Sequence, residues 1–377
     1  MIEVCDNDLA NISITKNKIE KSKNNSKRIK YLDIARCIAI ICVVLCHAVE
    51  KCYYDGNLML YSNQSVIFYI IIHTIGRLGV PIFMFLSGYL LLSRNYENEQ
   101  DIRKFYKNNF LSLLITTEIW IIIYNIYLGL LDKKFYLKSI ILEILFLQYV
   151  PMVNMWYMPM ILGIYMILPF LSLIIKKFSK KILAIPIIID FIIFFIIPTI
   201  NVILSTFKMP TLGSIFDASY LGGCFGIYFV FGYYIKEGIL KNIRTKNIIL
   251  VSLVSFICVC CILIFLYMNN NLSDLWYNSP FIFLCTLFLF ELFKRINTDK
   301  IGLKLMESIE NISKLSLGIF FIHVIVEDIL TKYIGKMNIN RPIRTVILFT
   351  ISFLLSYLIT FVFSKIKLLK KYLIRVK

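Results

Sequence analysis

Long apolar runs constrain this chain more than any other feature of its sequence. They approach or exceed 18 residues and are separated by short segments rich in Lys and Arg. Only 17% of the residues are charged, whereas a soluble domain usually carries about 25%. Since unpaired backbone groups are too costly in lipid, spanning segments of this kind form helices. The sequence therefore predicts an all-α polytopic membrane protein.

The apolar runs define about ten predicted transmembrane helices. A further segment at 139–150 contains Glu143 and is too short to cross a bilayer, so we expect an interfacial or re-entrant piece there. The membrane domain covers 31–368, between a polar cytoplasmic tail at 1–30 and a basic cytoplasmic tail at 369–377. The predicted spans lie near 31–51, 65–93, 109–131, 155–175, 182–203, 219–236, 247–268, 279–295, 312–332 and 343–366.

Basic residues outside the predicted spans are divided unequally between the two sides. If the N-terminus is cytoplasmic, the cytoplasmic set holds 29 Lys and Arg and the opposite set holds 9. The positive-inside rule then predicts a multi-pass protein of the cell membrane with both termini in the cytoplasm. The net charge of +18 follows from these loops. No motif or basic stripe typical of nucleic-acid binding accompanies it, so nucleic acid is not an expected partner.

The ten cysteines do not indicate a disulfide or metal framework. Most of them lie inside apolar runs, where cysteine behaves as a small hydrophobic residue. No two pairs combine into zinc-ligand spacing, so we expect neither a metal site nor a bound cofactor.

The three histidines, His47, His73 and His323, all fall within predicted spans. A charge at mid-bilayer costs roughly 2.5–3.5 kcal/mol, so ionisable side chains there face the bundle interior. In the first span, Arg36 and His47 share a face about three turns apart, or roughly 16 Å. An arginine at the cytoplasmic mouth can hold a phosphate, and a deeper histidine can transfer a proton. Alternatively, Arg36 reaches headgroups and His47 joins a hydrogen bond between helices.

Two further pairs of ionisable residues have helical spacing. His73 and Arg77 lie four residues apart on one face of the second span, where Pro81 is expected to bend the helix. Arg77 is expected to lie deeper than His73, and its alternative role is a buried clamp between helices. In the ninth span, His323 and Glu327 also share a face, where the carboxylate can orient the imidazole.

The segment MWYMPMILGIYMILPF, at 155–170, brings Trp156 and Tyr157 to the outer interface of the fourth span. Aromatic residues at this depth are typical of the aromatic belt of membrane proteins. Together with His73, they are also the candidates for binding substrate on the outer side.

Five segments occur in a fixed order between position 28 and about position 330: RIKYLDIARCIAIICVVLCHAVE, GRLGVPIFMFLSGYLLL, MWYMPMILGIYMILPF, GYYI and LSLGIFFIHVIVEDIL. In this order they resemble the acyltransferase-3 family of integral membrane acyltransferases. The chain is most similar to the stand-alone branch of that family, which includes the O-acetyltransferase of enterobacterial common antigen.

The resemblance implies transfer of an acyl group, usually acetyl from cytoplasmic acetyl-CoA, to a hydroxyl of a cell-surface glycan or lipid-linked saccharide. By motif, His47 resembles the first-span catalytic histidine of the family and Arg36 its partner. Arg77 resembles the arginine that precedes the VPIF segment, and Glu327 more loosely resembles a late-span carboxylate. Thr74 stands where many members carry a second arginine.

These matches imply roles for the same residues. Arg36 and Arg77 are expected to bind the anionic acyl-CoA. His47 is expected either to act as a general base on the acceptor hydroxyl or to be acylated itself. Arg77 or the imidazole of His323 can stabilise the oxyanion of the thioester. Acetyl and longer acyl groups such as succinyl both fit this chemistry.

A transporter of a saccharide, a lipid-linked sugar or an amino acid would also need buried charges. Two features make it the lesser reading: no internal repeat is visible, and the first span carries a single-histidine motif. A purely structural subunit of the cell envelope would leave three buried histidines and two buried arginines unexplained.

Overall fold

The computed structural model describes residues 28–53, 58–213 and 222–376, so nearly all of the predicted tail at 1–30 lies outside it. The described residues form helices and contain no strand, which confirms the predicted all-α class. The elements are α2 (Lys30–Cys52), η1 (Leu58–Leu60), α3 (Asn63–Arg77), α4 (Gly79–Leu91), α5 (Glu99–Phe105), η2 (Tyr106–Leu111), α6 (Ser112–Asp132), α7 (Leu137–Ile144), α8 (Tyr157–Lys177), α9 (Lys180–Phe191), η3 (Ile192–Ile196), α10 (Ile197–Thr206), α11 (Gly223–Lys236), α12 (Thr245–Met268), α13 (Pro280–Arg295), η5 (Thr298–Lys300), α14 (Leu303–Ile334), α15 (Arg341–Lys365) and α16 (Lys367–Tyr372).

Eight helical segments of the described chain are long and apolar enough to cross a membrane. Two of the ten predicted spans correspond to shorter helices, α11 with 14 residues and α13 with 16. The first positions of the predicted span at 219–236 lie outside the described residues. The multi-pass helical architecture is thus observed, while the count of ten stays a prediction. The segment at 139–150 contributes α7, whose eight residues are too few to span a bilayer.

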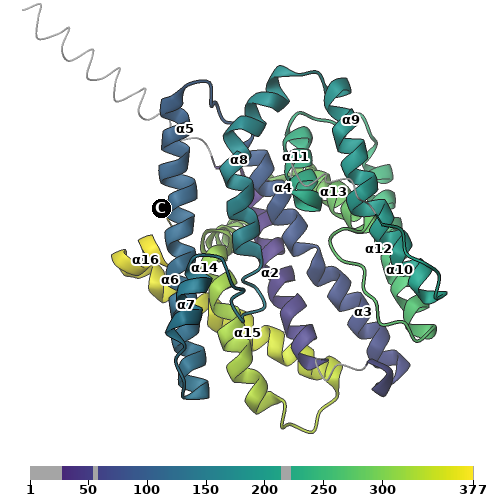
Figure 1. Cartoon of the computed structure of the whole chain (residues 1–377), viewed down its shortest axis with the longest axis vertical. Helices are drawn as coiled ribbons and strands as arrows, with labels where there is room; N and C mark the ends of the chain where they lie inside the picture. The colour runs from purple at the N-terminus through teal and green to yellow at the C-terminus, as the bar shows by residue number, and fades with distance from the viewer. Residues whose placement is uncertain (1–27, 54–57, 214–221, 377) are drawn as a thin grey trace, which may run out of the picture.

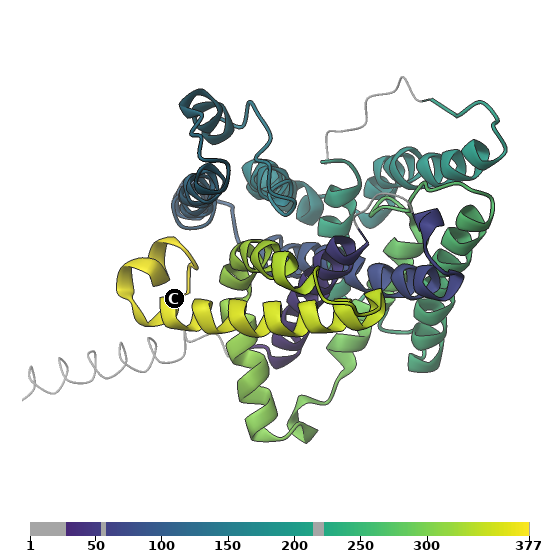
Figure 2. The same cartoon turned by 90° about the horizontal axis from the view of Figure 1, so that it is seen from below.

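The first spanning helix, α2, lies near the centre of the bundle (Figure 1). It packs against α3, α4, α14 and α15, and 72% of its most apolar window is buried. By contrast, only 17% of the corresponding window of α9–α10 is buried, because these helices lie at the edge. Figure 2 shows the same centre from below, with α15 passing beside it. The polar side chains of α2 therefore point into protein rather than lipid.

Glycines allow α4 and α11 to approach backbone to backbone. A Cβ added at Gly88 would lie 1.8 Å from the carbonyl oxygen of Phe229, and one added at Gly232 would lie 2.3 Å from that of Phe85. Any larger residue would separate the helices, which is why small residues occupy such membrane interfaces. This contact holds α4, which carries part of the site, firmly within the bundle.

The helix ends gather into two groups. At what we call the terminal end, α2 begins and α4, α8 and α11 end, and Lys236 donates a hydrogen bond to the Ser93 hydroxyl at 2.6 Å. At what we call the distal end, α2 ends and α3 and α15 begin, and Arg341 donates to the Cys52 carbonyl at 2.5 Å. The predicted basic loops correspond to the terminal end, which also carries the C-terminal residues.

Candidate active site

Glu50, in the last turn of α2, joins two of the three histidines. Its Oε2 lies 3.0 Å from Nδ1 of His47, and its Oε1 lies 2.9 Å from Nε2 of His73 on α3. A carboxylate only accepts hydrogen bonds, so each of these ring nitrogens donates to it. A neutral His47 therefore carries its free lone pair on Nε2. Glu50 thus links His47 on α2 to His73 on α3.

Gly76 brings α3 against α2 beside this group. A Cβ at position 76 would lie 2.7 Å from Cα of Cys46, the residue before His47. At the next residue, Arg77, α3 ends, and α4 begins at Gly79. The interruption expected near Pro81 thus lies at Leu78, because the proline ring clashes with the preceding turn of the helix.

His323, on α14, stacks on His47 with ring centroids 5.3 Å apart and ring planes 29° apart. Its Nδ1 donates to the carbonyl oxygen of Ile319 at 3.0 Å, while its buried Nε2 has no hydrogen-bond partner among the described residues. The expectation that Glu327 orients this imidazole is wrong, because the carbonyl of its own helix is the partner instead. Glu327 is fully buried, and neither of its oxygens makes a hydrogen bond to a described residue.

Arg77 faces the distal end. It forms an ion pair with Asp274, donates to the carbonyl oxygen of Leu275 at 2.7 Å and lies 5.2 Å from the ring centroid of Trp276. These contacts tie the α12–α13 connection to α3, so the structure places Arg77 as a clamp between elements and not beside Arg36. Asp274 carries no signal in the sequence, since it lies in a loop far from Arg77 along the chain.

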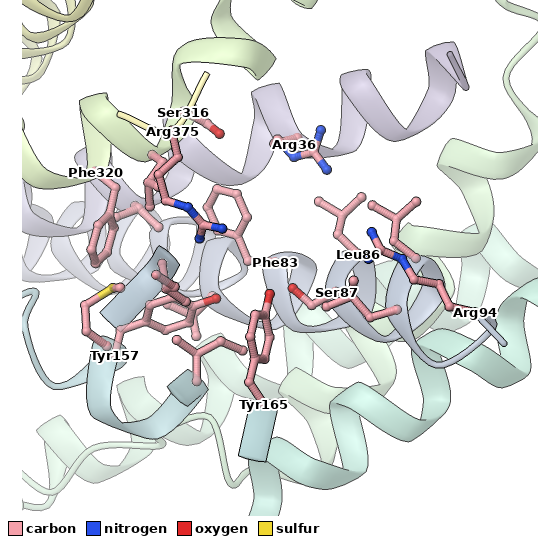
Figure 3. A pocket seen from close by; sticks show the side chains of 18 residues that line it. Arg36, Phe83, Leu86, Ser87, Arg94, Tyr157, Tyr165, Ser316, Phe320 and Arg375 are labelled. Atoms are coloured by element: carbon pink, nitrogen blue, oxygen red, sulfur yellow. The ribbon is translucent and has the colours of Figure 1, made fainter. Parts of the chain in front are cut away.

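A cavity of about 250 Å³, which we call the terminal cavity, opens toward the terminal end. Figure 3 shows the guanidinium groups of Arg36, Arg94 and Arg375 and the hydroxyl groups of Ser87 and Tyr165 facing the same space. These residues come from α2, the end of α4, the C-terminal segment and α8. Tyr157 and Ser316 also line it, and the rest of the lining is apolar: Val43, Val80, Phe83, Leu86, Leu90, Leu91, Leu113, Met158, Ile161, Leu317 and Phe320.

A second cavity of about 610 Å³, which we call the vestibule, adjoins the first and shares Arg36 and Arg375 with it. Arg28 and Lys314 also line it. Its acidic side chain, Asp33, accepts hydrogen bonds from Arg28 at 2.5 and 2.7 Å. This pairing raises the pKa of the Arg28 guanidinium.

Deeper in the bundle, His47 lines a small cavity of about 20 Å³, which we call the histidine cavity. It shares Val43, Val80, Tyr157 and Phe320 with the terminal cavity. On its other side, Trp156 also lines a cavity of about 560 Å³, the distal cavity, whose walls are aromatic and apolar. The distal cavity is lined by Phe146, Leu147, Gln148, Tyr149, Val150, Met152, Met155, Trp156, Pro159, Met160 and Phe225.

The sequence matches one protein family over most of its length. A family model described as an acyltransferase domain matches residues 29–362. The chain belongs to the acyltransferase-3 family. It is therefore an acyltransferase, an enzyme that transfers acyl groups other than aminoacyl groups, and a multi-pass membrane protein. No curated protein and no solved structure matches it significantly.

Asn154 is a candidate site residue that carries no distinctive sequence signal. It lines the histidine cavity, and its Nδ2 donates to the Tyr124 hydroxyl at 3.0 Å and to the Phe320 carbonyl at 2.9 Å. Its buried Oδ1 accepts no hydrogen bond from the described part of the protein. A fixed acceptor atom beside His47 is suited to receiving a hydrogen bond from a substrate hydroxyl.

Cys46, Glu50 and His73 place potential ligand atoms within 4.8 Å of one another. Cysteine spacing alone does not predict such a group. The three could hold a metal ion, but the hydrogen bonds to Glu50, including a 3.7 Å contact from Cys46 Sγ, already account for their closeness. The acyltransferase thus has a partly buried hydrogen-bonded network centred on one carboxylate.

The arrangement is suited to general-base chemistry. Glu50 holds the Nδ1 hydrogen of His47, which leaves Nε2 as the basic atom, as an orienting carboxylate does for catalytic histidines elsewhere. His47 itself is mostly buried, and His323 covers one face of its ring. A group entering the histidine cavity therefore meets a pre-oriented base from which water is largely excluded.

Proposed function

We propose that the protein is a membrane O-acyltransferase of the cell membrane that moves an acyl group, in the first instance acetyl, from cytoplasmic acyl-CoA to a hydroxyl of a cell-surface glycan or lipid-linked saccharide. One observation carries the proposal. His47, oriented by Glu50, lies in a cavity between an arginine-lined cavity at the terminal end and an aromatic cavity at the distal end.

The donor is assigned to the terminal end. The excess of Lys and Arg in the loops of that end supports a cytoplasmic position under the positive-inside rule. Acyl-CoA is cytoplasmic and anionic, and Arg36 provides a guanidinium in both the terminal cavity and the vestibule. The apolar walls beyond Arg36 suit the extended, weakly polar arm that carries the thioester. Arg77 is assigned a clamping role at the distal end, because Asp274 already neutralises it.

The acceptor is assigned to the distal cavity. Its aromatic walls, which include Trp156, Tyr149 and Phe225, offer flat apolar faces of the kind on which sugar rings rest. Trp156 lines both this cavity and the histidine cavity. A hydroxyl of the acceptor would thus approach His47 past Trp156. His73 is assigned a supporting role, since its contact with Glu50 fixes the carboxylate that orients His47.

His47 can carry the proton through both steps of the transfer. Nε2 of His47 accepts the proton of the acceptor hydroxyl while the oxygen attacks the thioester carbonyl carbon. Collapse of the tetrahedral intermediate breaks the carbon–sulfur bond, and the proton passes from His47 to the departing thiolate. The products are the O-acyl ester and CoA. Tyr157, the only residue with a polar side chain among the four shared by the terminal and histidine cavities, is placed to donate to the carbonyl oxygen.

The same Nε2 could instead attack the thioester and carry the acyl group itself. Rapid acid quenching of the enzyme with labelled acetyl-CoA separates the two routes. Label retained on His47 supports the covalent route, and label found only in the acceptor supports direct transfer.

The proposal is tested by mass spectrometry of surface glycans from cells with and without the gene and from cells expressing His47→Ala. We expect O-acetyl groups that depend on the protein and disappear in the His47→Ala cells at equal membrane abundance. Arg103→Ala is the matched control, because Arg103 is exposed and lines none of the four cavities named above. Unchanged glycan acetylation in the His47→Ala cells would overturn the proposal.

A further inference from the structure

The C-terminal segment after α15 folds back onto the bundle. Leu373 and Ile374, which follow α16, are 8% and 1% exposed. The indole nitrogen of Trp120 on α6 donates to the Leu373 carbonyl at 2.9 Å. Ile374 packs on α14, where its Cγ2 would lie 2.6 Å from a Cβ added at Gly318. Residues 373 and 374 thus anchor the segment between α6 and α14, although the family match ends earlier, at residue 362.

Arg375 follows these anchors in the left-handed backbone region, with φ of 51°. A residue with a Cβ avoids this region unless the surrounding structure holds it there. Here the anchored residue Ile374 on one side holds it, as does the hydrogen bond from the Val376 backbone to the Lys370 carbonyl at 3.2 Å on the other. The turn directs the Arg375 side chain into the terminal cavity and the vestibule, both of which it lines (Figure 3).

The Arg375 guanidinium is held in place without being neutralised. It donates to the backbone carbonyls of Asn108 and Asn109 in η2 at 3.2 and 3.4 Å. Among the residues that the structure describes, no carboxylate lies within 4 Å of Arg375 or of Arg94. Partial burial also lowers the pKa of Arg375. A partly buried positive charge with no acidic partner among the described residues is a favourable site for an anion.

The positive charge of the neighbouring Arg36 is also only partly neutralised. Arg36 lies 3.7 Å from Asp33, but that carboxylate already accepts two hydrogen bonds from Arg28 and one from Ser313 at 2.6 Å. Three guanidinium groups therefore face the terminal cavity, and among the described residues the one carboxylate within 4 Å of any of them, that of Asp33, is shared with Arg28. A planar guanidinium binds two phosphate oxygens through two parallel hydrogen bonds. The cavity therefore favours a ligand with a phosphate group over an uncharged, apolar ligand.

We propose that Arg375 binds a phosphate of the nucleotide half of the acyl-CoA donor, and that the C-terminal segment is thereby one wall of the donor site. The inference rests on the proposed function for the identity of the donor. Arg375 lies where the terminal cavity meets the vestibule, so the apolar arm extends from it toward His47 and the nucleotide occupies the wider space. The residue determines donor specificity and does not take part in the chemical step.

Binding to the purified full-length protein in nanodiscs tests this inference without an acceptor. Three probes are compared by calorimetry: CoA, dephospho-CoA, which lacks the 3′-phosphate, and pantetheine, which lacks every phosphate. We expect Arg375→Ala to weaken CoA binding at least tenfold, to reduce the preference for CoA over pantetheine by the same factor, and to leave pantetheine binding unchanged. Arg375→Lys keeps the positive charge but loses the pair of parallel hydrogen bonds. Its affinity for CoA should therefore lie between those of wild type and Arg375→Ala.

The control is Arg103→Ala, which removes an exposed arginine that lies outside these cavities and should bind all three probes as wild type does. Unchanged CoA binding by Arg375→Ala would overturn the inference. An equal loss of CoA and pantetheine binding would also overturn it, because it would show that Arg375 only supports the structure. Failure of the proposed function looks different: wild type binds CoA in this assay, yet cells show no acyl transfer to glycans. If wild type binds no CoA, the donor assignment and this inference both fall.

Discussion

The imidazole rings of His47 and His323 stack 5.3 Å apart, although the two residues come from the first and the penultimate spanning helices of the described chain. One ring is oriented by the carboxylate of Glu50 and the other by the carbonyl of Ile319. His47 lines the histidine cavity, whereas Nε2 of His323, which has no hydrogen-bond partner among the described residues, is buried behind it.

Replacing Glu50 with Gln should lower the rate of acyl transfer by about 10²–10⁴-fold, the usual contribution of a well-placed general base. The amide donates as well as accepts, so it no longer fixes the tautomer of His47. The measurement is glycan acetylation per unit of membrane protein. Glu307→Gln, at an exposed position, is the control for loss of a carboxylate and should behave as wild type. A Glu50→Gln protein with the wild-type rate would rule out the orienting role.

Replacing His323 with Phe should preserve the stack on His47 but remove the unpartnered Nε2. We expect the transfer rate to fall by about 100-fold or more, because a proton-transferring or oxyanion-binding group is lost. CoA binding should stay at the wild-type value, since His323 does not line the terminal cavity. Loss of CoA binding together with the rate would instead mean that His323 acts only by supporting the packing of α14.

Gly76→Ala should destabilise the fold by about 1–3 kcal/mol, as overpacking of a tight interface does. The added Cβ would lie 2.7 Å from Cα of Cys46, so α3 must move away from α2. That movement also lengthens the contact between His73 and Glu50, and activity should fall with stability. Thermal unfolding in detergent provides the measurement, and Gly163→Ala is the matched control because its Cβ would meet nothing within 4 Å. Equal melting temperatures for the two variants would show that α2 and α3 can accommodate the extra methyl group without destabilisation.

Asp274→Asn should destabilise the protein by about 1–3 kcal/mol, because Arg77, which is 6% exposed, loses its acidic partner. A double variant that also carries Arg77→Met removes the stranded charge and should regain part of that stability. The free energy of unfolding of the four proteins in this cycle gives the coupling directly. If the two changes were simply additive, the ion pair would contribute nothing, and Arg77 would have to be explained by another contact.

Much of this fold can be predicted from the sequence because a bilayer allows only a few kinds of backbone structure. Apolar runs of this length must form helices, and an ionisable residue within them must face protein. The stripe of Arg36 and His47 along the first span therefore leads to a terminal cavity and a histidine cavity that share Val43 on the same helix. The grouping of basic loops at one end follows from the same alternation of spans.

Only the tertiary structure decided which residues meet. Glu50 joins His47 to His73, Asp274 neutralises Arg77, and Arg375 enters the cavity of Arg36. Apart from the contact of His47 with Glu50, three residues further along α2, none of these contacts can be read from helical periodicity, which relates residues within one helix and says nothing about the rotation or depth of its neighbours. Those are set by close packing at positions such as Gly76, where a single Cβ would separate two helices. The sequence by itself determined that these charges are buried, and the packing of the helices determined which partner each one faces.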